Sequence, residues 1–325
     1  MRAMLVSRFG GPEVLESAEM PEPVPYRGQV VIDVDVADVL FLETQLRSGN
    51  LADAFDLRPP FVLGGAVAGH VRSAGSDVDA GLVGRRVAAR TLNHGGYAEQ
   101  AAASVESVVP VPAGLELSQA AALLHDGPTA LGLFDNAAIR SGESVLVTAA
   151  AGGLGLLLVQ LASAAGARVI GAARGDRKLD LVSAQGAHDV VDYSEMGWQE
   201  RVRAMTGGRG ADVVFDGAGG AIGQVAFDVT AQDGRFSAHG AAGGGFAAID
   251  TEEAARRGIT VRGIEQVQFE PAEAKALAER AFSAAADGGI RPVIGTTFPL
   301  AGAASAHKAI EQRAVLGKTL LTVGR

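Results

Sequence analysis

The segment SGESVLVTAAAGGLGLLLVQLASAAGARVIGAARGDRK, from Ser141 to Lys178, decides the fold. Its run Ser144–Thr148 is short and apolar, which is typical of a strand buried on both faces of a parallel sheet. A glycine turn, the apolar helix Leu156–Ala165 and a second strand, Ala167–Ala172, follow in that order. The segment therefore predicts a strand–turn–helix–strand unit.

The turn of this unit places small residues three apart, at Ala149, Gly152 and Gly155, with Gly153 and Leu154 between the last two. Small residues let the pyrophosphate of a dinucleotide lie almost against the backbone, and the helix that starts here points its free N–H groups at that phosphate. A glycine turn alone is a weak signal, but its place between a strand and a helix makes it specific. We expect these five positions to bind a dinucleotide cofactor.

The end of the second strand selects the cofactor. Enzymes that use NAD usually place Asp or Glu here to accept the ribose hydroxyls. This chain has Arg174 instead, with Arg177 and Lys178 close behind, and the acid Asp176 lies beyond the strand end. Cations at these positions would pair with a ribose 2′-phosphate. The sequence therefore favours NADPH over NADH.

Composition narrows the class of protein. The 325 residues allow two domains, and 48% hydrophobic with 20% charged residues is typical of a soluble globular protein. No apolar stretch has membrane-spanning length without polar breaks, and the first residues lack a signal-peptide layout, so we expect a cytoplasmic protein. A net charge of −9 argues against a nucleic-acid partner, and the absence of cysteine removes disulfides and thiolate metal sites.

Two patterns divide the chain. Residues 1–118 contain many short strand-like runs between turn residues, which is typical of a small barrel-like domain. From 119 to 265 helical and strand-like runs alternate, which predicts a doubly wound parallel sheet. The elements of 266–325 have no partner in that sheet, so we expect them to return to the first domain. The predicted fold class is α/β, with a β-rich domain (1–118 and 266–325) and a nucleotide-binding domain (119–265).

Several motifs resemble those of one family along nearly the whole chain. They are FGGPEVLE (9–16), GGYAEQ (95–100), the glycine turn, TGGRGADVVFDGAGG (206–220), RPVIGTTFPL (291–300) and EQRAVLGK (311–318). The family is the medium-chain dehydrogenase/reductase superfamily, and the resemblance is to its zinc-free quinone oxidoreductase and enoyl reductase branch. It implies a GroES-like catalytic domain, a Rossmann domain, an NADPH cleft between them, and a homodimer.

The resemblance also implies roles for individual residues. A threonine of the family's G-L-T-A segment approaches the nicotinamide, and Gly127-Pro128-Thr129-Ala130 matches that segment. The family's contacts to the 2′-phosphate carry over to Lys178, Tyr193 and Arg313. The predicted cofactor-binding residues are thus Thr129, Ala149, Gly152, Gly153, Leu154, Gly155, Arg174, Lys178, Tyr193, His239, Arg313 and Lys318.

Two departures from the family concern the active site. Zinc-bearing relatives have a G-H-E triplet where this chain reads Gly64-Gly65-Ala66, so we expect no metal and no Lewis-acid catalysis by zinc. The zinc-free branch usually carries V-N-x-x-D followed by tyrosine in the first active-site loop. Here the corresponding residues are Leu40, Glu43 and Gln45, which predicts a more apolar substrate pocket. Leu40, Gln45 and His94 are the predicted pocket residues.

Hydride transfer without a metal restricts the substrate. Conjugated acceptors such as quinones, enones and enoyl thioesters delocalise the developing charge to an oxygen that hydrogen-bond donors can hold. The candidate catalytic groups are Thr129, His125 and Glu43, since a histidine titrates near neutrality and a buried glutamate can exchange protons. His125 and Glu43 can equally be packed or ion-paired side chains.

Three functions remain open from the sequence. The first is an NADPH-dependent, zinc-independent reductase of quinones or activated C=C bonds, acting on a small hydrophobic conjugated substrate. The second is a non-redox cyclase or isomerase on the same scaffold, suggested by the altered residues Leu40 and Gln45. The third is a non-catalytic NADPH-binding protein. Turnover of NADPH separates the first from the other two.

Overall fold

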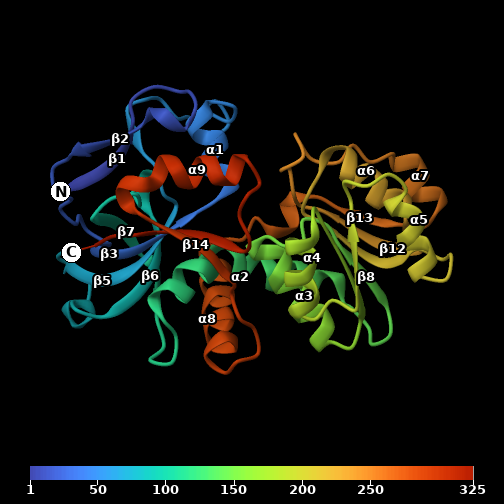
Figure 1. Cartoon of the computed structure of the whole chain (residues 1–325). Coiled ribbons are helices and arrows are strands. Elements are labelled where there is room, and N and C mark those ends of the chain that lie inside the picture. The colour runs from blue at the N-terminus through green and yellow to red at the C-terminus, as the bar shows by residue number, and fades with distance from the viewer. Residues whose placement is uncertain (325) are drawn as a thin grey trace. The chain divides into compact units, whose positions relative to one another are not determined.

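A computed structural model describes residues 1–324, and these form two compact units (Figure 1). The β-rich unit comprises Met1–Pro128 and Glu270–Arg325, and the parallel-sheet unit comprises Thr129–Phe269. The units thus divide at residues 128 and 269, where the change of sequence pattern suggests 118 and 265.

One helix, α2 (Leu117–Ala137), contains the first division, although the sequence predicts two helices, 119–124 and 129–138. Pro128 lies inside this helix and removes one backbone donor, which ordinarily kinks or ends a helix. Almost every side chain from Ala120 to Leu133 is buried or half-buried. Burial of the helix on most of its circumference therefore outweighs the lost hydrogen bond.

The β-rich unit is built on a six-stranded sheet with the order β14-β15-β3-β5-β6-β7, and an additional β3–β7 pairing closes four of these strands into a barrel. The barrel strands are β3 (Gln29–Val39), β5 (Ala66–Ala74), β6 (Arg86–Thr91) and β7 (Gln100–Pro110). A smaller sheet contains β1 (Arg2–Val6), β2 (Leu15–Glu19) and β4 (Phe61–Val62). The helices of the unit besides α2 are α1 (Phe41–Ser48), α8 (Pro271–Ala286) and α9 (Ala303–Glu311).

The C-terminal elements return to this unit, as the sequence predicts. Strand β15 (Lys318–Thr322) pairs with β3 in antiparallel register, Leu320 opposite Asp38, and in parallel with β14 (Ile294–Pro299). In Figure 1 the red elements α9 and β14 accordingly lie among the blue elements of the N-terminal segment. Short 3-10 turns occur at Pro12–Val14, Ala80–Leu82, Leu92–His94 and Leu300–Gly302 in this unit and at Ile264–Val267 in the other.

The parallel-sheet unit has the strand order β10-β9-β8-β11-β12-β13, in which β9 and β10 follow on one side of β8, and β11, β12 and β13 follow on the other side. The strands are β8 (Ser144–Val147), β9 (Arg168–Ala173), β10 (Asp189–Asp192), β11 (Ala211–Asp216), β12 (Thr230–Ala238) and β13 (Thr260–Arg262). The helices are α3 (Gly153–Ala164), α4 (Asp176–Ala184), α5 (Trp198–Met205), α6 (Gly220–Asp228) and α7 (Thr251–Arg256). Right-handed crossovers place α3 and α4 on one face and α5 and α6 on the other, which is the Rossmann arrangement.

Buried aliphatic and aromatic side chains form a separate core in each unit. In the parallel-sheet unit, Leu146, Ile170, Val214 and Phe236 of the four central strands belong to one core, which explains why these strands read as continuous apolar runs. This core fixes the strand ends that carry the predicted cofactor residues.

Candidate active site

The glycine turn joins the carboxyl end of β8 to α3, at the point where the strand order reverses. Ala149 has a left-handed φ of 49°, and Gly152 is the N-cap of α3. A Cβ on Gly155 would lie 2.6 Å from the carbonyl oxygen of Ala149, whereas the nearest atom to a Cβ on Gly152 is 3.4 Å away. The backbone of the turn therefore leaves no room for a side chain at Gly155 but leaves space at Gly152, beside the first N–H groups of α3. This geometry fits a dinucleotide pyrophosphate.

A buried hydrogen-bond network fixes the neighbouring strand end. The Thr148 hydroxyl donates to Asp216 Oδ1 at 2.7 Å, and the same oxygen accepts from the backbone N–H of Ala218 (3.2 Å) and Gly219 (3.0 Å). Burial raises the pKa of Asp216, and these hydrogen bonds act against that rise. The network ties the turn after β8 to the turn after β11. Sequence reasoning missed both side chains, although DGAGG directly after a strand is a signal for such a turn.

The predicted 2′-phosphate side lies at the ends of β9 and β10. Arg174 is exposed and follows β9, and Lys178 is half-buried in the first turn of α4. Tyr193 follows β10, and its backbone N–H donates to the carbonyl of Ala173 at 3.1 Å. Since β9 and β10 are parallel neighbours with Ala173 opposite Asp192, three of the predicted contacts come from adjacent strand ends.

His239 follows β12 at the same edge of the sheet. Its ring is buried, packs edge-on against Phe215, and has Nδ1 3.1 Å from the Ser237 hydroxyl. Burial lowers the pKa of His239 to about 4, so the ring is neutral at neutral pH. A Cβ on Gly217 would lie 3.5 Å from His239 Nε2 and 3.6 Å from the Ala149 methyl group. The ring thus lies close to the glycine turn.

His125 and Thr129 lie four residues apart on α2, so they project from the same face of this helix. Burial and, to a smaller extent, the positive charge of Arg90 lower the pKa of His125 to about 4. The imidazole is therefore neutral at neutral pH and can donate a hydrogen bond, but it is not an imidazolium acid. Thr129 is half-buried at the first position of the parallel-sheet unit.

Glu43 is enclosed in the β-rich unit, with 2% of its surface exposed. Its carboxylate accepts hydrogen bonds from the backbone N–H of Leu40 (2.9 Å) and Gly65 (2.8 Å) and from the Tyr97 hydroxyl (2.6 Å). The Tyr97 hydroxyl also lies 3.1 Å from His307 Nε2. Burial raises the pKa of Glu43, and the bond from Tyr97 is the largest effect that opposes the rise. This arrangement gives Glu43 the role of fixing the start of α1 to the segment before β5.

Lys318 is also enclosed. Its ammonium lies 2.9 Å from Asp38 Oδ2 and 3.2 Å from Asp126 Oδ1, and only 5% of the side chain is exposed. The neighbouring carboxylates raise the pKa of Lys318 despite its burial. Two carboxylates of the β-rich unit therefore occupy this ammonium, and we do not retain its predicted contact with the cofactor. Sequence reasoning did not place Asp38 or Asp126 beside Lys318.

The predicted substrate residues lie around α1 and the turn before β7. Leu40 is the half-buried N-cap residue of α1, and the Gln45 side chain donates to the Thr44 hydroxyl at 3.0 Å and accepts from Asn50 at 3.0 Å. His94 has a left-handed φ of 58° and an edge-on contact with Phe55 at 6.2 Å, and burial lowers its pKa. Arg313, after α9, is exposed with φ 56°.

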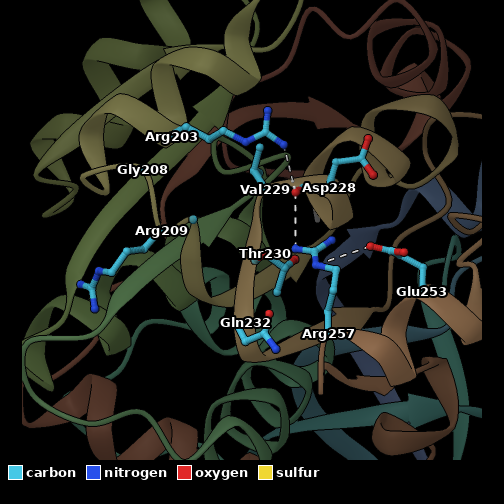
Figure 2. A pocket seen from close by; sticks show the side chains of 10 residues that line it. Arg203, Gly208, Arg209, Asp228, Val229, Thr230, Gln232, Glu253 and Arg257 are labelled. Atoms are coloured by element: carbon cyan, nitrogen blue, oxygen red, sulfur yellow. Dashed lines mark hydrogen bonds and ion pairs between the residues drawn. The ribbon is translucent and has the colours of Figure 1, made fainter.

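A cavity of about 500 Å³ lies at the opposite edge of the parallel sheet, near the amino ends of β11 and β12 (Figure 2). Figure 2 shows Arg203 and Arg257 directed at one backbone oxygen; both donate to the Asp228 carbonyl, at 3.2 and 3.4 Å. Asp228 is the last residue of α6, so these cations cap the carboxyl end of that helix. The cavity does not belong to the dinucleotide turn.

Among residues 1–324, no group of three or more His, Asp or Glu side chains is arranged to hold a metal ion. In the same range, no helix is both long enough and apolar enough to cross a membrane.

Comparison with known proteins agrees with this architecture. Residues 26–113 match the alcohol dehydrogenase GroES-like domain, and residues 153–283 match the zinc-binding dehydrogenase domain. The chain is 31% identical to the quinone oxidoreductase of Sus scrofa, over 99% of this chain and 97% of that protein. It is 32% identical to the 2-haloacrylate reductase of a Burkholderia species, over 98% of each chain.

A solved structure extends the likeness to the cofactor. The mycobacterial protein Rv1454c complexed with NADPH superposes with a TM-score of 0.91 and 32% identity, over 99% of this chain and 100% of that one. The glycine turn at the switch point of the parallel sheet and the cations after β9 fit this cofactor. The chain belongs to the medium-chain dehydrogenase/reductase superfamily, in its quinone oxidoreductase branch, and is an NADPH-dependent oxidoreductase.

Proposed function

We propose that this reductase acts on small hydrophobic substrates in which a C=C bond is conjugated with a carbonyl group: quinones, enones or enoyl compounds. The observation that carries the substrate class is the state of the first active-site loop. Glu43 is enclosed by Tyr97 and two backbone N–H groups, and the residue that starts α1 is Leu40. This loop therefore offers the substrate an apolar surface in place of a polar group.

The named relatives support the same class. A quinone and a 2-haloacrylate both contain an electron-poor C=C bond next to a carbonyl carbon, and the relatives carry these substrates in their names. A double bond of this kind accepts hydride at carbon, and the charge moves to the oxygen, where donors can stabilise it without a metal.

For the cofactor, we propose that the backbone of Ala149–Gly155 holds the pyrophosphate and that Arg174, Lys178, Tyr193 and Arg313 bind the 2′-phosphate. Arginine and lysine provide charge-assisted donors for a phosphate, and the helix N-terminus favours the anionic pyrophosphate. His239 lies beside the glycine turn as a neutral ring. We infer that it packs against the bound nucleotide.

NADPH supplies the hydride when bound. We propose that Thr129 orients the nicotinamide and that His125, on the same face of α2, donates a hydrogen bond to the substrate oxygen on which charge develops. A neutral imidazole suits this role because it retains a ring N–H as a donor. In this proposal, the proton that completes the reduction comes from solvent rather than from Glu43, whose carboxylate is enclosed.

Oxidation of NADPH against a panel of acceptors tests the substrate class. The panel contains an ortho-quinone, a para-quinone, a hydrophobic enone, an enoyl thioester and an unconjugated ketone, each assayed also with NADH. We expect turnover with at least one conjugated acceptor, a reduced product in equal amount to the NADPH consumed, and none with the ketone. Turnover of the ketone but of no conjugated acceptor would contradict the proposal.

Leu40→Asn provides a matched test of the pocket, because it introduces a polar side chain and keeps the backbone N–H that donates to Glu43. The variant should raise KM for the most hydrophobic acceptor and change KM for NADPH little, because Leu40 is assigned to the substrate. An equal effect on acceptor and cofactor would remove Leu40 from the substrate pocket.

A further inference from the structure

We propose that Asp192 is a positioning residue that sets the preference for NADPH over NADH. It joins the turn that carries Arg174 and Lys178 to the turn that carries Tyr193. The inference rests on the proposed 2′-phosphate contacts of these three residues, and it adds a residue that touches neither nucleotide.

The geometry around Asp192 links two strand ends. Asp192 is the last residue of β10, and its Oδ2 accepts from the backbone N–H of Gly175 at 2.7 Å. Its Oδ1 accepts from the backbone N–H of Ser194 at 2.7 Å and from the Ser194 hydroxyl at 2.5 Å. One carboxylate thus spans the turn after β9 and the turn after β10.

Gly175 is the point at which this link controls the cations. It has φ 80° and is the N-cap of α4, so it lies between Arg174 and the helix that presents Lys178. A Cβ at Gly175 would meet no atom within 4 Å, so no neighbouring atom packs against that side of the residue. The Gly175 carbonyl accepts from the backbone N–H of Lys178 and Leu179, which ties it to α4, and the hydrogen bond from its own N–H to Asp192 ties it to β10.

Hydrogen bonds from the protein hold both oxygens of the Asp192 carboxylate. Partial burial acts to raise its pKa, but the hydrogen bonds from Ser194 and Gly175 and the positive charge of Arg174 outweigh burial and lower it. The carboxylate is therefore ionised at neutral pH. Three donors share its two oxygens, which partly neutralises the repulsion that a free carboxylate would exert on a nearby phosphate.

This arrangement predicts an effect on one nucleotide only. Loss of the Asp192 link frees the Gly175 turn, and the cations lose their fixed position for a 2′-phosphate. NADH has a hydroxyl in place of that phosphate, so its binding does not depend on the position of these cations.

Asp192→Asn in the full chain tests the proposal, because the amide is nearly isosteric but cannot accept on both sides. We expect the Kd for NADPH, followed by nucleotide fluorescence, to rise about tenfold, as loss of one charge-assisted hydrogen bond implies. The Kd for NADH should stay within about twofold, and KM for NADPH should rise with little change in kcat.

Asp189→Asn is the matched control. Asp189 lies at the other end of β10, in an ion pair with Arg168 at 2.9 Å, so the variant makes the same charge change on the same strand away from the cofactor edge. Neither Kd should change. Ser194→Ala, which removes one donor and leaves the Gly175 bond, should weaken NADPH less than Asp192→Asn does.

Three outcomes would overturn the proposal. Unchanged NADPH binding by Asp192→Asn would mean that the carboxylate does not position the cations. Tighter binding would mean that the carboxylate repels the phosphate. Equal weakening of NADPH and NADH would give Asp192 a purely structural role. Arg174→Ala with Lys178→Ala separates this failure from that of the cofactor assignment. If the double variant weakens both nucleotides equally, the proposed 2′-phosphate contacts themselves are wrong.

Discussion

At the scale of single residues, the ion-pair cluster of Lys318, Asp38 and Asp126 links three distant parts of the β-rich unit. Asp38 is near the end of β3, Asp126 is on α2 and Lys318 begins β15. Breaking a buried pair leaves uncompensated charge in the interior, which costs about 3–5 kcal/mol. The cluster thereby holds α2, which carries His125, against the barrel.

We expect Lys318→Met to lower the free energy of unfolding by about 3–5 kcal/mol, because two buried carboxylates then lack their cation. Asp38→Asn should cost less, since Lys318 keeps Asp126 as a partner. Urea unfolding of the two variants at pH 7 measures the difference. A smaller loss in Lys318→Met than in Asp38→Asn would show that the ammonium is not the centre of the cluster.

The neutral state of His125 predicts the pH profile of turnover. Burial lowers the pKa of His125 to about 4, so its protonation does not change between pH 6 and 8. The kcat of the wild type should therefore not fall around pH 6.5 through titration of His125, and the pH profile of His125→Asn should have the same shape there. His125→Asn, which keeps a donor, should retain kcat within about tenfold, whereas His125→Phe should lose about 100-fold, as for removal of one oxyanion donor. Equal kcat in the two variants would remove the hydrogen-bond role.

Residues near one another in sequence were predictable, and residues paired across the fold were not. The glycine turn and Arg174 follow from local pattern, because strand, turn and helix are contiguous. Lys318 and Asp38 are 280 positions apart, and the β15–β3 register brings them together. No local pattern in EQRAVLGK shows that its lysine is enclosed. The same holds for Glu43, whose partner Tyr97 is 54 positions away.

At the scale of secondary-structure elements, the glycine turn after β8 has two positions with different physical demands. A Cβ added at Gly155 would lie 2.6 Å from the carbonyl oxygen of Ala149 and 2.8 Å from the Cα of Ala150. These are backbone atoms, which cannot move aside as a flexible side chain can. Gly152 has ordinary space around a Cβ and a φ of −81°, which any residue adopts. Gly155 serves the packing of α3 on the sheet, and Gly152 leaves the space in which we propose that the pyrophosphate binds.

Gly155→Ala should therefore lower the Tm and weaken both nucleotides, with a cost of about 1–3 kcal/mol for overpacking. Gly152→Ala should keep the Tm within about 2 °C, yet weaken NADPH and NADH alike by at least tenfold, because the methyl group lies where the pyrophosphate approaches. Differential scanning calorimetry and nucleotide titration measure the two effects. A stable Gly152→Ala variant with unchanged affinity would move the pyrophosphate away from this turn.

Most helices and strands were predicted to within a few residues, and two helices that begin or end in loop-like sequence were not. The sequence predicts helices at 178–185 and 303–312 and a strand at 212–216, and these correspond to α4, α9 and β11. The helix α1 was missed because its end, Leu46–Asn50, has the composition of a loop; Gly49, with φ 89°, ends the helix there. The helix α6 was missed because its start at Gly220 continues a glycine-rich turn.

At the scale of the whole molecule, two sets of buried groups bind protons differently in the folded and unfolded chain. Burial lowers the pKa of His125 and His239 to about 4 and that of His307 to about 3, against about 6.5 in an unfolded chain. Burial raises the pKa of Asp38 to about 7, although the Lys318 charge opposes the rise, and it also raises the pKa values of Glu43 and Asp216.

The two sets act on stability with opposite signs. Between pH 4 and 6.5 these histidines are protonated in the unfolded chain but not in the folded chain. Their contribution to the free energy of unfolding therefore falls as the pH is lowered. Over about the same range the folded chain keeps a proton on Asp38 that the unfolded chain releases, so this contribution falls as the pH is raised towards 7. The stability of the wild type should therefore rise with pH less steeply in this interval than the three histidines alone would make it rise.

Substituting one group of either set should make the pH dependence due to the opposite set visible in the unfolding free energy. Each group that differs by one proton changes the slope of the unfolding free energy by about 1.4 kcal/mol per pH unit. We expect the stability of Asp38→Asn to rise more steeply with pH than that of the wild type between pH 4.5 and 6.5. His239→Gln should show the opposite change. Urea unfolding at half-unit steps of pH measures the slopes independently of any overall loss of stability. An unchanged slope in Asp38→Asn would mean that Asp38 is already ionised in the folded protein over this interval and that the charge of Lys318 outweighs its burial.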